Sequence, residues 1–205
     1  MVSDDAAPER IGELIEVTSH ALVAQSVRLH QAPPLGSFVR AAGPSGPVYA
    51  VVCEVRTTSL EAGGRPIARG YADVIDEQIY QANPDLELVL RTEFQALCVG
   101  YEAADGPRQH LPPQPPPLHY SVYACSPAEV RRFVARLDYL RALLAAGPPL
   151  ADELTAANLR QAAAAFGAAR DEFLVRAGRA LALLLHDDYD RLAALLRRLR
   201  VEAPA

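Results

Sequence analysis

Five prolines fall within the eight residues Leu111–Leu118, and this run restricts what the chain can fold into. Proline fixes the backbone φ angle and has no amide hydrogen, so the run can be neither a helix nor an inner strand of a sheet. It predicts a stiff, extended connector over residues 111–118, with a different unit on either side. The alternative is a proline-rich ligand for an aromatic groove on another protein.

The segment Ile11–Tyr123, which includes the connector, has the pattern of short strands. It is rich in Val, Ile, Thr and Tyr, in runs that Gly and Pro separate. The run Val48–Val55 is apolar on both faces, as expected of a strand inside a closed or covered sheet. A turn is predicted at Pro33–Ser37, where Gly36 permits a positive φ. Other predicted elements are strands at Ile11–Val17, Leu22–Val27, Phe38–Ala41 and Leu86–Tyr101, and one helical turn at Asp76–Tyr80.

The segment after the connector changes to Ala, Leu and Arg, which favours helices. Ser126 is a good N-cap, Pro127 suits the first helical position, and Glu129 places an acid in the first turn. The helix that begins here is predicted to run to about Ala146. The sequence Gly147-Pro148-Pro149 then stops it.

Apolar residues recur at helical spacing through the rest of the chain, which predicts two helices or one long helix with a break near Gly167. Leu195 and Leu199 are expected to form an exposed seam on the last of them. The most apolar stretch, Ala177–Leu196, contains charged residues, so it is not expected to span a membrane.

We therefore expect an α+β protein with four regions. Residues 1–10 form a flexible N-terminus, and residues 11–110 form a small β-barrel of about six strands. Residues 111–118 are the connector, and residues 119–201 form an α-helical C-terminal unit.

Charge and composition exclude several functions. The net charge of −5 gives no general positive field for a nucleic-acid backbone. All twenty basic side chains are Arg, so a Schiff-base lysine and a phosphate-binding lysine are excluded. The three cysteines, Cys53, Cys98 and Cys125, are widely spaced and suggest buried apolar positions rather than a zinc site or a disulfide framework. Acids near the N-terminus are unlike a signal peptide, so a cytoplasmic protein is expected.

No catalytic or metal-binding pattern stands out. One group of acids could hold a metal ion for a nuclease, but no lysine or nearby histidine completes such a site. The run His186–Asp190 places its side chains in different directions on a helix, and His110 and His119 lack partners for a catalytic triad. We expect no catalytic residues, no metal, no cofactor and no small-molecule substrate. The group of acids consists of Asp76, Glu77, Asp85, Glu87 and Glu93.

Three motifs in the first half resemble a known family. Ile11–Val17 begins with an Ile-Gly step, Pro34–Val39 turns through Leu-Gly, and Tyr49–Val55 is the returning strand. Their order resembles the HAS barrel, which HerA helicases share with the α and β subunits of ATP synthase. The resemblance covers residues 11–59 and extends more loosely to Tyr101. The segments Arg65–Gly70 and Leu90–Ala96 are similar to stand-alone bacterial versions of this barrel.

The resemblance implies a non-enzymatic protein that docks on a partner or on another copy of itself. A HerA-type ATPase in DNA processing is the implied partner, because no ATPase motif follows the barrel in this chain. Partner-binding residues are expected at Arg65, Arg69 and Arg91, and at Leu195 and Leu199. The alternative is an accessory nucleic-acid-binding or nuclease-associated subunit that acts through its Arg-rich helical tail. We do not expect a membrane partner or direct contact with nucleic acid.

Overall fold

The structure is a computed structural model that describes residues 9–61, 64–70, 73–147 and 150–199. The expected flexible N-terminus therefore lies outside the described residues except for positions 9 and 10, and so does most of the predicted stop at residues 147–149. The strands are β1 (Arg10–Val17), β2 (Ala21–Ser26), β3 (Phe38–Ala41), β4 (Val48–Ser59), β5 (Leu90–Ala103), β6 (Gly106–Arg108) and β7 (Ser121–Ala124). The helices are α1 (Glu77–Ala82), α2 (Leu86–Val89), α3 (Pro127–Phe133), α4 (Leu140–Leu144), α5 (Leu150–Ala164), α6 (Arg170–Leu184) and α7 (Tyr189–Leu199), with a short 3₁₀ turn at Gly167–Ala169.

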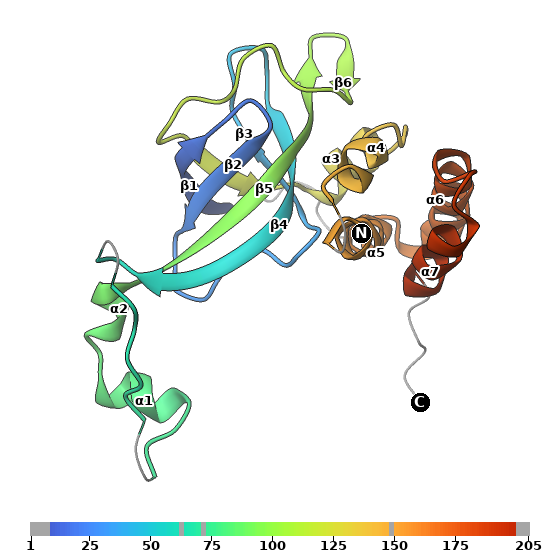
Figure 1. Ribbon diagram of the computed structural model, residues 1–205. Helices are drawn as coiled ribbons and strands as arrows, with labels where there is room; N and C mark the ends of the chain where they lie inside the picture. The colour runs from blue at the N-terminus through green and yellow to red at the C-terminus, as the bar shows by residue number, and fades with distance from the viewer. Residues whose placement is uncertain (1–8, 62–63, 71–72, 148–149, 200–205) are drawn as a thin grey trace.

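Six antiparallel strands close into a ring. The order around it is β1, β2, β5, β4, β3 and β7, and β7 returns to pair with β1. The seventh strand, β6, pairs only with the end of β5 (Figure 1). The expected α+β class, with a β-rich first part and helices in the C-terminal part, is confirmed at this level.

The ring has apolar residues on both of its surfaces. Along β4, Val48, Ala50 and Val52 face the interior of the ring and pack with Leu14 and Phe94. The alternating residues point outward into a second core that the helices share, because successive side chains of a strand face opposite sides. These outward residues are Tyr49, Val51 and Cys53. The prediction that this strand is covered on both faces is confirmed for residues 48–53, whereas Glu54 and Val55 are exposed.

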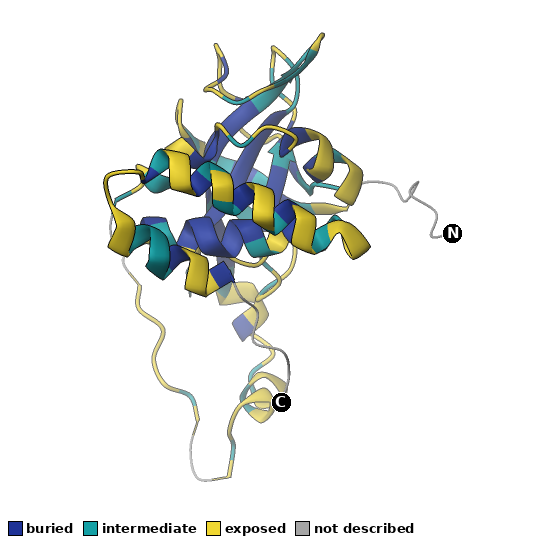
Figure 2. Cartoon of the chain, turned by 90° about the vertical axis from the view of Figure 1, so that its right-hand side faces the viewer, coloured by how far each residue is buried: buried dark blue, intermediate teal, exposed yellow. Residues whose placement is uncertain are grey.

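The helices cover the outer surface of β3, β4 and β5. More than half of α5 is buried, and α6 and α7 lie beyond it with apolar inner faces and exposed outer faces (Figure 2). Phe38 of β3 meets Phe133 of α3 and Tyr139 in edge-on ring contacts with centroids 5.6 Å apart. No helix within the described residues is both long and apolar enough to cross a lipid bilayer.

A buried polar network joins the ring to α5. The Asn158 amide donates to the carbonyl oxygen of Gly36 at 2.9 Å, and the Tyr139 hydroxyl donates to Asn158 Oδ1 at 2.8 Å. Gly36 has the predicted positive φ, at 83°, and a Cβ there would lie 2.6 Å or less from the backbone of α5. The turn before β3 therefore needs glycine for its conformation and for its close contact with the helix.

Gly12 shows a second close approach, this time inside the ring. A Cβ at this position would lie 2.8 Å from the carbonyl oxygen of Gln25 on β2 and 3.1 Å from the ring of Phe94. The closed sheet therefore requires glycine at this position of β1, because a larger residue would not fit.

Four local predictions differ from the structure. Residues 150–199 form three helices, α5, α6 and α7, where two helices or one long helix with a break near Gly167 were predicted. The strand β7 lies after the proline-rich segment, so a strand of the ring comes from the region expected to be helical. The strand predicted from Leu86 begins at Leu90, because the turn after Pro84 continues as α2. Proline already has a helical φ, so it can precede such a turn.

The helix predicted to run from Ser126 to Ala146 is two helices, α3 and α4. Its start is confirmed, since the Glu129 amide donates to Ser126 Oγ at 3.3 Å and the Ser126 amide donates to Glu129 at 2.8 Å. The break has a cause far away in the sequence. The Gln109 amide donates to the carbonyl oxygens of Phe133 and Arg136 at 2.6 and 2.9 Å, which satisfies the end of α3.

The Asn158 network gives a stability prediction. In Asn158→Ala, the Tyr139 hydroxyl and the Gly36 carbonyl oxygen stay buried without their partner. We expect the free energy of unfolding to fall by about 2–4 kcal/mol. Tyr139→Phe removes only one donor, so its loss should be nearer about 1 kcal/mol. Urea unfolding followed by circular dichroism measures both, and equal stability of Asn158→Ala and wild type would contradict this role.

Candidate partner-binding arm

A long excursion between β4 and β5 projects from the ring. We call residues Leu60–Val89 the arm; it carries α1 and α2, and α1 lies far from the ring (Figure 1). No described side chain of the arm belongs to either hydrophobic core. Large apolar side chains are nevertheless exposed on it, including Ile67 at 79%, Ile75 at 58% and Leu88 at 77%. Monomeric proteins rarely gather exposed apolar residues on one projection unless it makes contacts.

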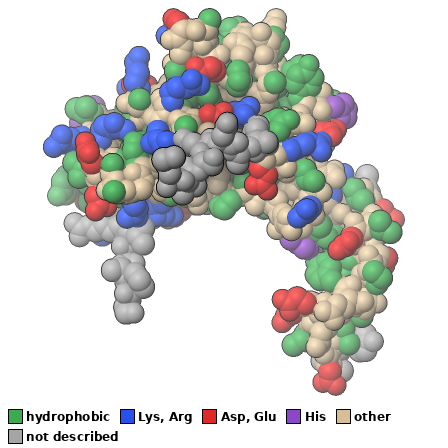
Figure 3. Space-filling model, turned by 180° about the vertical axis from the view of Figure 1, so that it is seen from behind, with side chains coloured by type: hydrophobic (Ala, Val, Ile, Leu, Met, Phe, Trp, Pro, Cys, Tyr) green, Lys and Arg blue, Asp and Glu red, His purple; other side chains and the backbone are tan. Residues whose placement is uncertain are grey.

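The arm is also strongly acidic. It has six acids and two arginines, a net charge of −4, whereas the whole chain carries −5. Figure 3 shows acidic and apolar side chains along this projection, while blue arginine side chains gather on the body of the molecule. The arm and the body therefore differ in charge as well as in shape.

A compact hydrogen-bonded root attaches the arm to the ring. The His30 amide donates to Thr92 Oγ1 at 2.8 Å, and Thr92 Oγ1 lies 2.8 Å from Thr57 Oγ1. His30 Nε2 lies 2.6 Å from the hydroxyl oxygen of Tyr80 on α1. His30 has a positive φ of 60°, a strained conformation for a residue other than glycine. These contacts join the loop after β2, the two strands and the arm.

A buried carboxylate strengthens the same root. The side chain of Glu93 is only 2% exposed, and it lies between Arg56 at 2.8 Å and Arg91 at 2.7 Å. The arginines keep this buried carboxylate paired, because an unpaired buried charge costs about 3–5 kcal/mol. The start of β5 is thereby fixed relative to β4.

Three of the five predicted partner-binding residues lie in or next to the arm. Arg65 and Arg69 lie on the arm, and Arg91 lies at its root. Arg69 joins the two sides of the arm through an ion pair with Asp85 at 2.9 Å and a bond to Asn83. Arg65 is exposed.

The other two predicted residues lie elsewhere. Leu195 and Leu199 on α7 are 0% and 5% exposed and pack in the core between the helices and the ring. The expectation that they form an exposed seam is wrong. The apolar stripe of α7 packs the helix against the rest of the protein. The spacing of apolar residues is the same in a stripe that packs internally and in one that contacts a partner, so the sequence does not distinguish the two.

The acids that were considered as a possible metal site lie in different environments. Glu93 is buried and Asp85 is paired with Arg69, whereas Asp76 and Glu77 are exposed at α1. In the part of the chain that the structure describes, no three His, Cys, Asp or Glu side chains come close enough to hold a metal ion.

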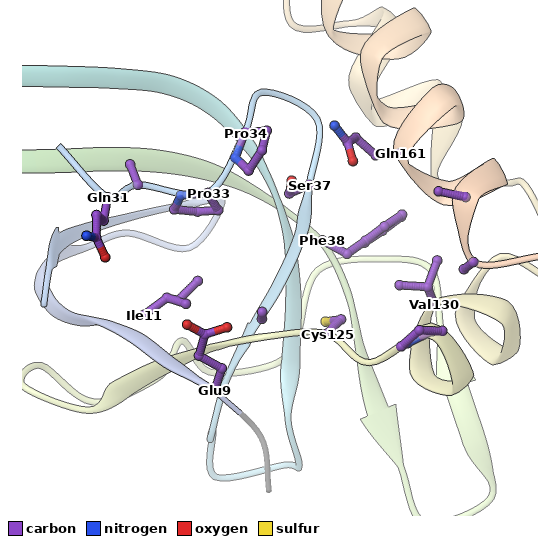
Figure 4. Close-up of a pocket in the computed structure, with 15 residues that line it drawn as sticks. Glu9, Ile11, Gln31, Pro33, Pro34, Ser37, Phe38, Cys125, Val130 and Gln161 are labelled. Atoms are coloured by element: carbon purple, nitrogen blue, oxygen red, sulfur yellow. The ribbon is translucent and has the colours of Figure 1, made fainter. Parts of the chain in front are cut away.

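A cavity of about 470 Å³ lies between the ring and the helices (Figure 4). Phe38 and Pro34 from the ring side and Val130 from α3 give it an apolar lining, with Glu9 and Cys125 as its ionisable groups. Burial raises the pKa of Cys125, and the described residues that line the cavity include no histidine to accept its proton. The cavity therefore lacks an activated nucleophile.

The thiols give a reactivity prediction. Burial raises the pKa of Cys53 to about 11 and that of Cys98 to about 12, so both stay protonated at pH 8. Iodoacetamide should therefore react about a hundred-fold more slowly with the folded protein than with free cysteine, and the rate should still rise above pH 9. The protein unfolded in urea is the fast-reacting control. Full modification of the folded chain at the rate of free cysteine would contradict the burial.

The root gives a second prediction. Tyr80→Phe removes the hydroxyl that bonds His30, but it changes neither core. We expect amide hydrogen exchange in α1 to quicken by about three- to ten-fold, since one hydrogen bond contributes about 0.5–1.5 kcal/mol. The urea midpoint of the whole protein should stay the same. Unchanged exchange in α1 would show that this bond does not hold the arm.

No protein-family model matches the chain, and no curated protein matches it at a significant level. The geometry of the described residues is therefore what supports a function.

Proposed function

We propose that this protein is a non-enzymatic interaction and assembly module: a small β-barrel of the HAS type that presents the arm to a protein partner. The observation that carries the proposal is the arm itself, an acidic projection with exposed Ile67, Ile75 and Leu88 and no share in the cores. A flexible loop with such side chains would lose entropy on binding, but the root limits that loss by fixing where the arm leaves the ring.

The closed ring supports the barrel assignment. All six of its strand pairs are antiparallel, and both glycines of the resembling motifs, Gly12 and Gly36, meet neighbouring backbone where a Cβ would clash. Ala50, which replaces the usual glycine of the family, is buried inside the ring and fits there. A HerA-type ATPase in DNA processing is the partner that the resemblance favours.

The charge distribution supports a protein partner over nucleic acid. The acidic arm would repel a phosphate backbone. Two arginines of the helical tail are already paired, Arg191 with Asp152 at 2.7 Å and Arg198 with Glu153 at 2.6 Å. Arg197 remains exposed on α7. Arg176 and Arg179 on α6 are exposed as well, but they lie near the exposed acids Asp171 and Glu172, so these arginines do not make the continuous basic surface that a nucleic-acid strand needs.

Removal of the arm tests the proposal. Ser59 and Leu90 are opposite each other in the β4–β5 pair, so a two-residue Asn-Gly turn can replace residues 60–89. The variant should keep the ring and the helices, because both cores are intact. It should lose binding to a purified HerA-type ATPase in a size-exclusion co-elution assay, whereas the wild type binds.

The matched control exchanges Arg197 for Glu on the exposed side of α7, far from the arm, and it should bind as the wild type does. If the chain without its arm still bound the ATPase as tightly as the wild type, the arm would not be the docking element. If the wild type bound no ATPase, the proposed partner would be wrong.

A further inference from the structure

One edge of the sheet is open where β4 leads to the arm. β3 pairs with residues 48–51 of β4, and the last backbone contacts on that side join Val52 to Gly36 at 2.8 Å and to Ser37 at 3.0 Å. Beyond these contacts, no strand among the residues that the structure describes pairs with this edge, whereas β5 pairs with the opposite one. In Figure 1, β4 forms the lower border of the β4–β5 ribbon. We call residues 54–59 the open edge.

The backbone groups of the open edge point alternately toward β5 and away from it. In an antiparallel pair, every second residue exchanges hydrogen bonds with the opposite strand, and the residues between them point their N–H and C=O groups the other way. The Leu60 amide donates to the carbonyl oxygen of Val89 at 2.8 Å, so the backbone of Leu60 points toward β5. The alternation then leaves Val55, Thr57 and Ser59 with their N–H and C=O groups on the open side. Such a row of backbone groups is a template for a further strand.

The ribbon that carries the open edge is already ordered. Arg56 pairs with the buried Glu93 at 2.8 Å, and Thr57 Oγ1 lies 2.8 Å from Thr92 Oγ1 across the ribbon. An ordered strand loses little entropy when a second strand pairs with it. The side chain of Val55 is 45% exposed, so it is accessible to an apolar residue of an added strand.

The charges around the open edge favour a basic strand. Glu54 is exposed at one end, and Glu61 is exposed two residues beyond the other end. Arg56, the one arginine of the open edge, is balanced by Glu93. The arm that follows carries six acids against two arginines. An extended segment with a basic residue toward each end therefore complements this edge.

We propose that the open edge binds an extended, basic segment of the protein partner, which adds a strand to the sheet. The inference rests on the proposed function, because β4 runs directly into the arm that docks on the same partner. Backbone hydrogen bonds from Val55, Thr57 and Ser59 supply affinity, and the two glutamates at the ends select basic side chains. At about 3.3 Å per residue the six residues span about 20 Å, which is the length of an ordinary strand.

A synthetic strand tests the edge without the partner. The probe is the end-blocked peptide Lys-Val-Thr-Val-Thr-Val-Lys, titrated into isotope-labelled protein and followed by NMR. At saturation, amide hydrogen exchange at Val55, Thr57 and Ser59 should slow about ten-fold, because exchange then requires the added strand to leave. Two control peptides should bind about ten-fold or more weakly: one N-methylated at every valine and threonine, which removes its donors, and one with Glu at both ends.

A matched pair of variants tests the same backbone groups from the side of the protein. Val55→Pro removes an outward N–H and leaves the pairing with β5, because edge strands accept proline where the N–H faces water. Val55→Thr keeps the N–H and the β-branched shape. The proline variant should bind the probe about ten-fold or more weakly than the wild type, and the threonine variant within about two-fold of it.

Two results would overturn the inference: exchange at the three amides that is unchanged with the probe in excess, or equal binding of the N-methylated and unmodified peptides. The exchange measurement uses the wild type, so it decides the question even if Val55→Pro fails to fold. If the ATPase bound through the arm but left the three amides unprotected, only this inference would fall. If the probe protected the edge but arm removal left binding of the ATPase unchanged, only the proposed function would fall.

Discussion

The outer surface of the ring is apolar along β3, β4 and β5, and the placement of the helices follows from that. Tyr49, Val51 and Cys53 point away from the ring interior, so the strand that carries them cannot face water. The helices after β7 cover this surface. The composition suggests two separate units, but the chain forms one body with two hydrophobic cores. The ring interior is a separate cluster built around Leu14, Leu22 and Phe94.

The arm is the exception to this burial. β4 and β5 continue as a pair well past the helical cover, and their last residues hold buried Glu93 and the contacts of His30. Buried ion pairs add little net stability, but they fix geometry where hydrophobic packing alone would allow sliding. The protein therefore combines a rigid base with a projection whose apolar side chains are left for contacts outside the chain.

Local patterns predicted much of the fold. The turn at Gly36, the cap at Ser126 and the doubly apolar β4 depend on residues close together in sequence, and the structure contains all three. β7 was not predicted as a separate strand, although the strand-like composition extends to Tyr123, because four residues beside a proline-rich run carry little periodicity. The break after α3 depends on Gln109, and the burial of Leu195 and Leu199 depends on packing against other elements. These are long-range effects, which local pattern does not contain.

The candidate site was only partly predictable, because it too depends on long-range effects. The arginines at 65, 69 and 91 lie in or beside the arm, yet the sequence did not show that residues 60–89 leave the body. Exposure of Ile75 and Leu88 is a property of the folded chain. The local signal was the break in the strand pattern between β4 and β5, and it suggested a loop.

The position of β7 in the ring has a consequence for synthesis. It fills the gap between β1 and β3, and Arg10 of β1 pairs with Tyr123, more than a hundred residues later. A growing chain on the ribosome can form the β3–β4 hairpin early, but the sheet stays open until residues 121–124 emerge. Such distant pairing carries a large loop-closure entropy and slows folding. The nascent protein thus spends most of its translation with two unpaired strand edges, which is the interval in which it most needs protection from aggregation.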